Sequence, residues 1–153
     1  MRKLDFKEID EDNFYEIVKL SDTLTPEQKN CVANNSYSIA EGSVHSYAYY
    51  RGIYEDDKPV GFFMLLVPND DTKGTEWDKF CLWRFMIAYE EQNKHYGVKT
   101  LDHIVKLAKE WGHDEIHTSC HMAGVSPYKF YLNYGFVDTG KVDDGEQVLL
   151  LEI

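Results

Sequence analysis

The residues best suited to chemistry lie in one short segment, Gln92–Gly97, between two strongly patterned stretches. Phe80–Ala88 is nearly all apolar, which predicts a strand buried on both faces. Val98–Trp111 carries apolar residues at helical spacing and predicts an amphipathic helix. A strand, a tight turn and a helix N-terminus form an anion site, because unpaired backbone N–H groups and the positive end of the helix dipole meet there. The segment therefore favours binding of a pyrophosphate group.

Two histidines offer a different kind of chemistry. His117 and His121 would lie on one face of an expected strand over 115–121, because alternate residues of a strand share a face. No third residue has the spacing of a metal ligand, so we expect no metal site. Cys120 would face the opposite side and is expected in the core.

Composition bounds the remaining possibilities. The 153 residues are enough for one domain, and 43% of them are hydrophobic. The net charge of −11 disfavours nucleic acid and anionic membrane and favours cationic partners, although an acidic surface also simply keeps a protein soluble. The first residues are polar, the longest apolar run is too short to cross a bilayer, and three scattered cysteines argue for a reducing compartment, so we expect a cytoplasmic protein.

The elements that must position these residues follow from local pattern. Thr25-Pro26-Glu27-Gln28 is a helix start with a capping box, and that helix is expected to break near Asn34. Ser126 and Pro127 start a later helix that ends at Gly135. The remaining expected elements are strands over 3–8, 46–54, 60–67, 115–121, 137–141 and 146–153 and a helix over 12–20, the last two strands forming a hairpin around 143–145. This order predicts an α+β arrangement around one central sheet.

Several stretches resemble the GNAT superfamily of N-acetyltransferases. QNKHYG at 92–97 is similar to the family pattern QGKGYG. PVGFFML at 59–65 and LWRFMI at 82–87 resemble strands of members identified as spermine/spermidine acetyltransferases. SPYKFYLNYGF at 126–136 and GEQVLLLEI near the end resemble the family's last helix and closing strand. The likeness runs from residue 32 to the C-terminus and is most specific over 82–136.

The chain departs from the pattern at Asn93 and His95, where the family has glycine. Glycine brings a backbone close to phosphate most easily. Asparagine tolerates a positive φ fairly well and histidine does so less often. Because the backbone amides remain, we expect weakened or altered CoA binding.

The resemblance implies a GNAT fold in a single domain over 1–153, with a mixed, mostly antiparallel twisted sheet of about seven strands and about four helices. It implies acetyl-CoA as cosubstrate, no metal, a small cationic amine acceptor with polyamines favoured, direct attack in a ternary complex, and a homodimer by analogy. The cofactor-binding residues that it implies are Met86, Ile87, Ala88, Gln92, Asn93, Lys94, His95, Tyr96, Gly97 and Val98.

The resemblance also implies a catalytic role for Tyr131, whose hydroxyl would protonate the departing thiolate, while a backbone N–H of Met86 or Ile87 would hold the polarised carbonyl. Periodicity alone favours a core aromatic at Tyr131, and it is the resemblance that favours the catalytic role. Trp83 and Tyr37 could line an acceptor pocket or fill the core. Five acidic residues near segments that shape the pocket could bind an amine or remain solvated: Glu41, Asp56, Asp57, Glu76 and Asp78.

Three functions stay open on this evidence: acetylation of a small cationic amine, acetylation of another amine (an amino acid, an aminoglycoside or a protein N-terminus), and a CoA-binding or sensing module with little catalysis. The fold does not choose among the acceptors. The substitutions at Asn93 and His95 keep the sensing module among the alternatives.

Overall fold

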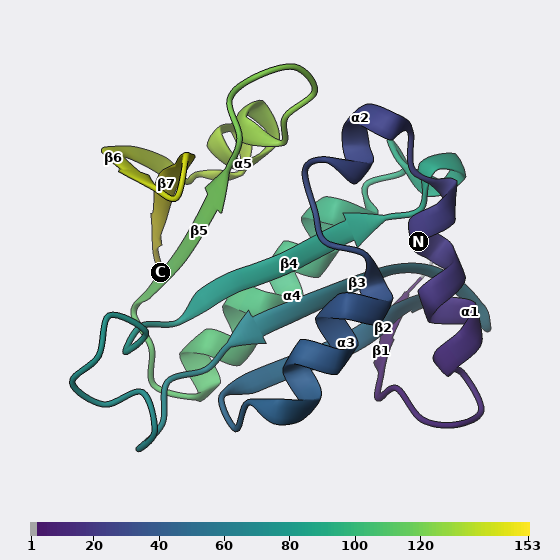
Figure 1. Ribbon diagram of the computed structural model, residues 1–153, viewed down its shortest axis with the longest axis horizontal. Helices are drawn as coiled ribbons and strands as arrows, with labels where there is room; N and C mark the ends of the chain where they lie inside the picture. The colour runs from purple at the N-terminus through teal and green to yellow at the C-terminus, as the bar shows by residue number, and fades with distance from the viewer. Residues whose placement is uncertain (1–2) are drawn as a thin grey trace.

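The fold is one seven-stranded sheet in the order β1-β2-β3-β4-β5-β7-β6, with helices on both faces (Figure 1). The computed structural model describes residues 3–153. The strands are β1 (Leu4–Lys7), β2 (Ala48–Glu55), β3 (Lys58–Leu66), β4 (Cys81–Ile87), β5 (Glu115–Cys120), β6 (Val137–Asp143) and β7 (Glu146–Glu152). The helices are α1 (Phe14–Lys19), α2 (Pro26–Lys29), α3 (Asn35–Val44), α4 (Tyr96–Glu110) and α5 (Tyr128–Tyr134), with short 3-10 turns η1 (Leu20–Thr23) and η2 (Tyr89–Glu91). The expected α+β class and mostly antiparallel sheet are confirmed.

The sheet is nearly divided in two between β4 and β5. All other neighbouring strands pair antiparallel, whereas β4 and β5 run parallel and share a single paired position, Cys81 with His117. Beyond that position the strands diverge toward their C-terminal ends, and β5, β6 and β7 turn away from the rest of the sheet (Figure 1). We refer to this divergence of β4 and β5 as the fork.

The core lies on both faces of the sheet, and β3 is its most buried strand. Helices α1 and α3 cover one face, and α4 covers the other (Figure 1). Phe62 and Met64 point to the α1–α3 side, while Phe63 and Leu65 point to the α4 side, as the alternation of a strand requires. β4 is less buried than expected, because its fork side has no neighbouring strand beyond its first residue.

The helix starts follow the local sequence closely. The capping box at Thr25 forms with both of its hydrogen bonds, at 3.2 Å each. The helix that it starts ends after one turn, and a separate helix, α3, begins with Asn34 as its N-cap. The expected break near Asn34 is therefore confirmed, and it is a complete separation of two helices.

Two helix-face predictions are wrong in part. α4 begins at Tyr96, and Val98 and Trp111 at its ends are 41% and 40% exposed instead of lying on the buried face. Tyr96 and Thr100 are buried in their place. A helix rotates by about 100° per residue, so Val98 lies about 200° around the helix from the buried Tyr96, and Trp111 lies beyond the last helical residue, Glu110.

The C-terminal hairpin forms where the sequence predicts it. Asp144 and Gly145 form its turn with φ of 48° and 78°, as a two-residue turn with both central residues at positive φ requires. β6, paired with β7, is the edge strand of the sheet. None of the helices in residues 3–153 is both long and apolar enough to cross a membrane.

Candidate functional site

The fork exposes backbone groups of β4 that a neighbouring strand would otherwise use. The Ala88 N–H donates to the Val60 carbonyl of β3 at 2.8 Å, and groups facing the same neighbour alternate along an antiparallel strand. Met86 therefore also turns its N–H and C=O toward β3. Ile87 turns its own toward the fork, so of the two amides proposed to hold a carbonyl oxygen the geometry favours Ile87.

A bulge in β4 lies just before these residues. Met64 pairs with Arg84 and Leu65 pairs with Leu82, which leaves Trp83 as an extra residue. A bulge bends its strand and increases the local twist. The bulge therefore contributes to the departure of β4 from β5 at the point where the fork begins.

The closed end of the fork is held by Thr118 of β5. Its hydroxyl donates across the gap to the Leu82 carbonyl of β4 at 3.0 Å. The side chain of Tyr131 in α5 lies near the same threonine and packs against Phe130 and Phe136. Burial raises the pKa of Tyr131 well above its ordinary value, and the nearby Thr118 side chain offsets only part of this rise. The tyrosine is thus a core residue whose hydroxyl, protonated at neutral pH, lies beside the base of the fork.

The segment Gln92–Gly97 follows the open end of β4 and leads into α4. Asn93 and His95 both have left-handed backbone, with φ of 63° and 69°. These are the two positions where the resembled pattern has glycine. Non-glycine residues in this region cost on the order of 1–3 kcal/mol each, with asparagine at the low end. The loop therefore has the backbone conformation that glycine favours without having glycine at these positions. Contacts with neighbouring residues must stabilise that conformation.

Neighbouring residues supply polar anchors on both sides of the loop. Before it, the buried Glu91 bonds Lys58 of β3 and, at 3.1 Å, Lys94. After it, the Tyr96 hydroxyl donates to the Glu55 carboxylate of β2. The Lys58 ammonium, assisted by Lys94, holds the pKa of Glu91 below its usual range. The loop is therefore tied to β3 through the ion pairs of Glu91 and to β2 through the hydrogen bond between Tyr96 and Glu55.

Gln92 anchors the loop from inside. Its side-chain Nε2 donates to the Ile87 carbonyl at 3.0 Å, which closes the turn that follows β4. Its amide also meets Gln28 of α2, at 3.0 Å and 3.4 Å. The backbone amides from Asn93 to the start of α4 lie at the positive end of a 15-residue helix.

Gly97 has a packing role that sequence did not indicate. A Cβ built at this position would lie 2.9 Å from Cζ of Phe130, whose ring also packs near Phe85. A side chain at Gly97 would therefore meet this aromatic ring of α5 directly. The glycine permits close contact between α4 and α5.

The opposite face of the fork carries aromatic and charged side chains between α3 and β4. His45, Tyr47 and Trp83 form a stack with centroids 4.9 Å and 6.0 Å apart. Arg84 pairs with Glu41 of α3 at 2.9 Å. Tyr37 is 61% exposed and does not fill the core.

The five acidic acceptor candidates do not gather into one cluster. Glu41 is paired with Arg84, and Asp57 lies 3.7 Å from Lys7. Asp56 and Asp57 form the β2–β3 turn, next to Lys58, which reaches the open end of β4. Asp78 precedes β4 at its other end and accepts a hydrogen bond from Thr72 at 3.2 Å. Glu76 is exposed in the loop that precedes β4.

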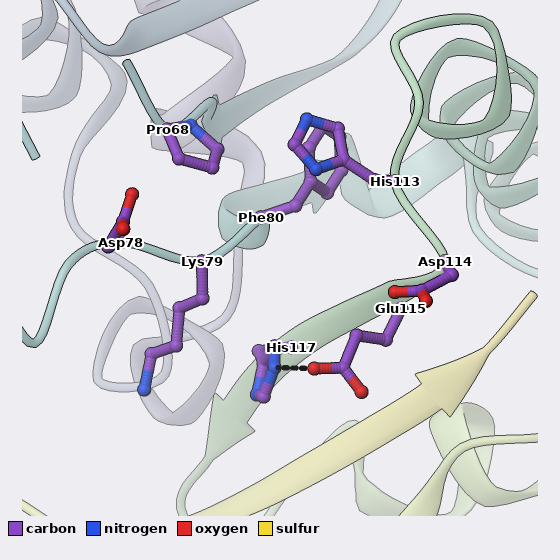
Figure 2. A pocket seen from close by; sticks show the side chains of 8 residues that line it. All are labelled: Pro68, Asp78, Lys79, Phe80, His113, Asp114, Glu115 and His117. Carbon is purple, nitrogen blue, oxygen red and sulfur yellow. Dashed lines mark hydrogen bonds and ion pairs between the residues drawn. The ribbon is translucent and has the colours of Figure 1, made fainter. Parts of the chain in front are cut away.

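A surface cavity of about 340 Å³ lies at the closed end of the fork, where β4 and β5 begin (Figure 2). Figure 2 shows His117 bonded to Glu115, at 3.3 Å, with His113 beside Phe80. Its remaining lining residues are Pro68, Asp78, Lys79 and Asp114. This cavity lies at the opposite end of β4 from the loop at 92–97.

The histidine pair considered from sequence does not share a strand. β5 ends at Cys120, so His121 lies beyond it and is exposed, while Cys120 is buried as expected. Over residues 3–153, the histidine, cysteine and carboxylate side chains form no group of three or more arranged to hold a metal.

A parallel strand pair that diverges beside a helix N-terminus, with a tyrosine hydroxyl at its base, is an arrangement suited to an extended anionic cosubstrate. The family model described as "Acetyltransferase (GNAT) family" matches residues 6–136. The chain therefore belongs to the GNAT acetyltransferase family, a class of acetyl-CoA-dependent acyltransferases. No curated protein sequence matches it.

Solved structures share the fold at low identity. The PaiA N-acetyltransferase from Thermoplasma acidophilum, in complex with coenzyme A, is 16% identical over 99% of both chains with a TM-score of 0.72. The GNAT domain of S. lividans PAT is 13% identical over 99% of this chain and 90% of that one, with a TM-score of 0.78. N-acetylglutamate synthase from Neisseria gonorrhoeae, with coenzyme A and N-acetyl-glutamate, is 13% identical over 99% of this chain and 35% of that one, with a TM-score of 0.72.

Sequence reasoning missed the residues that support the site. Thr118 follows the alternation of β5, with Ile116 and Cys120 also buried, so its inward direction was readable although its partner was not. No local pattern distinguished Glu55 and Glu91 from the other acidic residues, so the sequence did not indicate that they support the loop. Gln28 was noted only as a capping residue, and its contact with Gln92 spans 64 positions.

Proposed function

We propose that this protein transfers an acetyl group from acetyl-CoA to a primary amine of a small cationic acceptor, with polyamines favoured, by direct attack in a ternary complex. The observation that carries the proposal is the fork with the Ile87 amide turned into it, between the loop at 92–97 and Tyr131. The family match supports the acyl-transfer chemistry. The structure of the Thermoplasma relative in complex with coenzyme A supports the cosubstrate.

The pyrophosphate would lie on the amides from Asn93 to Val98, at the N-terminus of α4. This range includes Lys94, His95, Tyr96 and Gly97, and Gln92 supports it from the turn that follows β4. The pantetheine would run along the fork side of β4, past Ala88 toward Met86. Its amides would pair with strand groups that have no β5 partner in the described chain.

The reaction balances with few groups. The acceptor amine, once deprotonated by a base or water chain, forms a bond to the acetyl carbon, and the carbonyl oxygen gains negative charge. The Ile87 N–H would stabilise that oxygen. The carbon–sulfur bond then breaks as the carbonyl reforms, and the thiolate takes the Tyr131 proton. The nitrogen, positively charged after the attack, loses a proton to the base or water chain to give the amide, and the phenolate recovers a proton from solvent.

The acceptor class follows from charge. The chain carries −11 overall, which attracts polycations over long range. The stacked rings of His45, Tyr47 and Trp83 offer faces on which an organic cation could rest. The sequence resemblance to polyamine acetyltransferases points the same way.

A second candidate, acetylation of an amino acid, is favoured by the ion pair of Arg84 and Glu41 beside the β4 bulge. A guanidinium in that place could receive a carboxylate. The relative that holds N-acetyl-glutamate shares the fold. A CoA-binding module with little catalysis remains the third candidate.

A panel of amines, assayed for thiol release from acetyl-CoA, tests the proposal. Spermidine and spermine should be turned over with the highest kcat/KM. Good turnover of amino acids with none of any polyamine would reject the polyamine assignment. Binding of acetyl-CoA in calorimetric titration without turnover of any amine would favour the sensing module.

A further inference from the structure

We infer that Gln28 of α2 is a positioning residue that holds the loop at 92–95 in the shape required for the cosubstrate. Because this role serves acetyl-CoA binding, it rests on the function proposed above. Gln28 does not contact the loop backbone in any hydrogen bond and acts through the side chain of Gln92.

The two side-chain amides form a reciprocal pair. Gln28 Nε2 donates to Gln92 Oε1 at 3.0 Å, and Gln92 Nε2 lies 3.4 Å from Gln28 Oε1. Both residues are half-buried, so solvent competes only in part for these bonds. Each amide therefore restricts the rotamer of the other.

The capping box fixes the Gln28 end of this pair. Its Oε1 accepts from the Thr25 N–H, and its own backbone N–H donates to the Thr25 hydroxyl, at 3.2 Å each. A capping glutamine normally serves only its own helix. Here the same side chain reaches a second element 64 positions away.

The Gln92 end determines the path of the loop. Its Nε2 donates to the Ile87 carbonyl at 3.0 Å, so the side chain spans the turn between β4 and the strained residues. Asn93 and His95, which are separated by one residue, have φ angles of 63° and 69°. A glycine loop adopts such angles without help, whereas these residues need a fixed start.

A second contact ties the same segment to the open end of β4. The Tyr89 N–H donates to the Thr23 hydroxyl at 3.0 Å, just before α2. Cys31, just after α2, donates its thiol to the Val125 carbonyl of the β5–α5 connection at 2.9 Å. The α2 segment therefore bridges the chain that follows β4 and the chain that follows β5, and Gln28 is its contact with the loop.

Two matched variants isolate this role. Gln28→Met removes the amide at similar length and loses one bond of the capping box. Thr25→Val loses the other bond of the box and leaves the Gln28–Gln92 pair in place. A merely structural contribution of the cap would affect both variants alike.

The first measurement uses the full chain without ligand. Backbone amide order parameters for 93–95 should be near the rigid value of about 0.85 in the wild type and in Thr25→Val, and fall toward about 0.6 in Gln28→Met. The second is calorimetric titration with acetyl-CoA. Gln28→Met should raise Kd about fivefold, the size expected when the paired amide contact with Gln92 is lost, and steady-state assays should show kcat unchanged at saturation. In a Gln92→Met background, Gln28→Met should have no further effect.

The outcomes separate the two proposals. Unchanged order parameters in Gln28→Met, with normal acetyl-CoA binding by the wild type, would overturn the inference alone. Equal loosening in Thr25→Val would also overturn it, because the effect would belong to the helix cap. Failure of the wild type to bind acetyl-CoA would overturn the proposed function and any cofactor role of Gln28 with it.

Discussion

Replacing Tyr131 with phenylalanine is the most direct test of the proposed chemistry. The ring packs against Phe130 and Phe136, and phenylalanine preserves that packing. Loss of the hydroxyl leaves the nearby Thr118 satisfied, because Thr118 still donates to the Leu82 carbonyl at 3.0 Å. We therefore expect the free energy of unfolding to fall by about 1 kcal/mol or less.

The expected rate effect follows from the position of the hydroxyl. General acid catalysis is worth about 10²–10⁴-fold. Burial keeps the pKa of Tyr131 well above its ordinary value, so the proton is present at neutral pH but is held firmly. The same burial raises the proton affinity of a thiolate that forms in the fork. We expect a loss of about 10²-fold, the lower end of the range, or about 2.7 kcal/mol of transition-state stabilisation.

Single-turnover kinetics with saturating acetyl-CoA is the proper assay, since product release can mask a chemical step. Because the pKa of Tyr131 is raised, the wild-type rate should show no decline attributable to this hydroxyl from neutral pH up to the ordinary tyrosine pKa. The Kd for acetyl-CoA should change little. Tyr134→Phe is the matched control, because Tyr134 lies on the same helix as Tyr131. Its hydroxyl donates a 2.7 Å hydrogen bond to Asp102, and the variant loses that bond.

A Tyr131→Phe enzyme that matches the wild type in single turnover would refute the reasoning. The tyrosine would then be structural, and the thiolate would leave unprotonated or take its proton from water. An equal loss in Tyr134→Phe would also count against it, because the effect would then come from the stability of α5.

Three further predictions follow from the anchors and the charge. Glu91→Gln should destabilise the protein at pH 7, as measured by urea unfolding. The pKa of Glu91 lies below the usual value of about 4.3, and as the pH falls through it the variant and the wild type should become equally stable, because wild-type Glu91 is then neutral too. Gly97→Ala should cost about 1–3 kcal/mol in thermal unfolding by displacing Phe130, and a Phe130→Leu background should relieve most of that cost if contact with the ring is the cause. The kcat/KM for spermidine should fall between 0.1 M and 1 M salt more steeply than that for a neutral-bodied monoamine, since the Debye length drops from about 10 Å to about 3 Å; equal slopes would exclude long-range attraction.

Sequence pattern predicted the elements that have local signals. The Thr25 capping box, the hairpin turn at Asp144-Gly145 and the long amphipathic helix each depend on neighbours within a few positions. A sheet of about seven strands was expected only through the family resemblance, and the order of the strands within it was not predicted. No local rule states that β4 and β5 pair at one position and then diverge, because that depends on a bulge at Trp83 and on packing between distant segments.

The candidate site likewise has parts that the sequence predicted and parts that it did not. The loop at 92–97 was visible as a strand–turn–helix signal, and Tyr131 was visible by resemblance. The groups that hold them were not. Glu91 bonds Lys58 across 33 positions, and Tyr96 reaches Glu55 across 41, so their partners became apparent only once the sheet was assembled. Gly97 appeared to serve the phosphate, whereas its nearest neighbour is the ring of Phe130.

The substitutions at Asn93 and His95 argue for function in their own right. Both residues keep left-handed backbone at an energetic cost, and the surrounding contacts from Glu91, Gln92 and Tyr96 hold the segment between them. A loop with no binding role would be expected to have an ordinary turn, which avoids the cost of two left-handed residues. Anchors of this kind fix amide directions before a ligand arrives, which lowers the ordering cost of binding. The chain therefore replaces glycine flexibility with external support, and the wild-type loop should be rigid in the absence of acetyl-CoA.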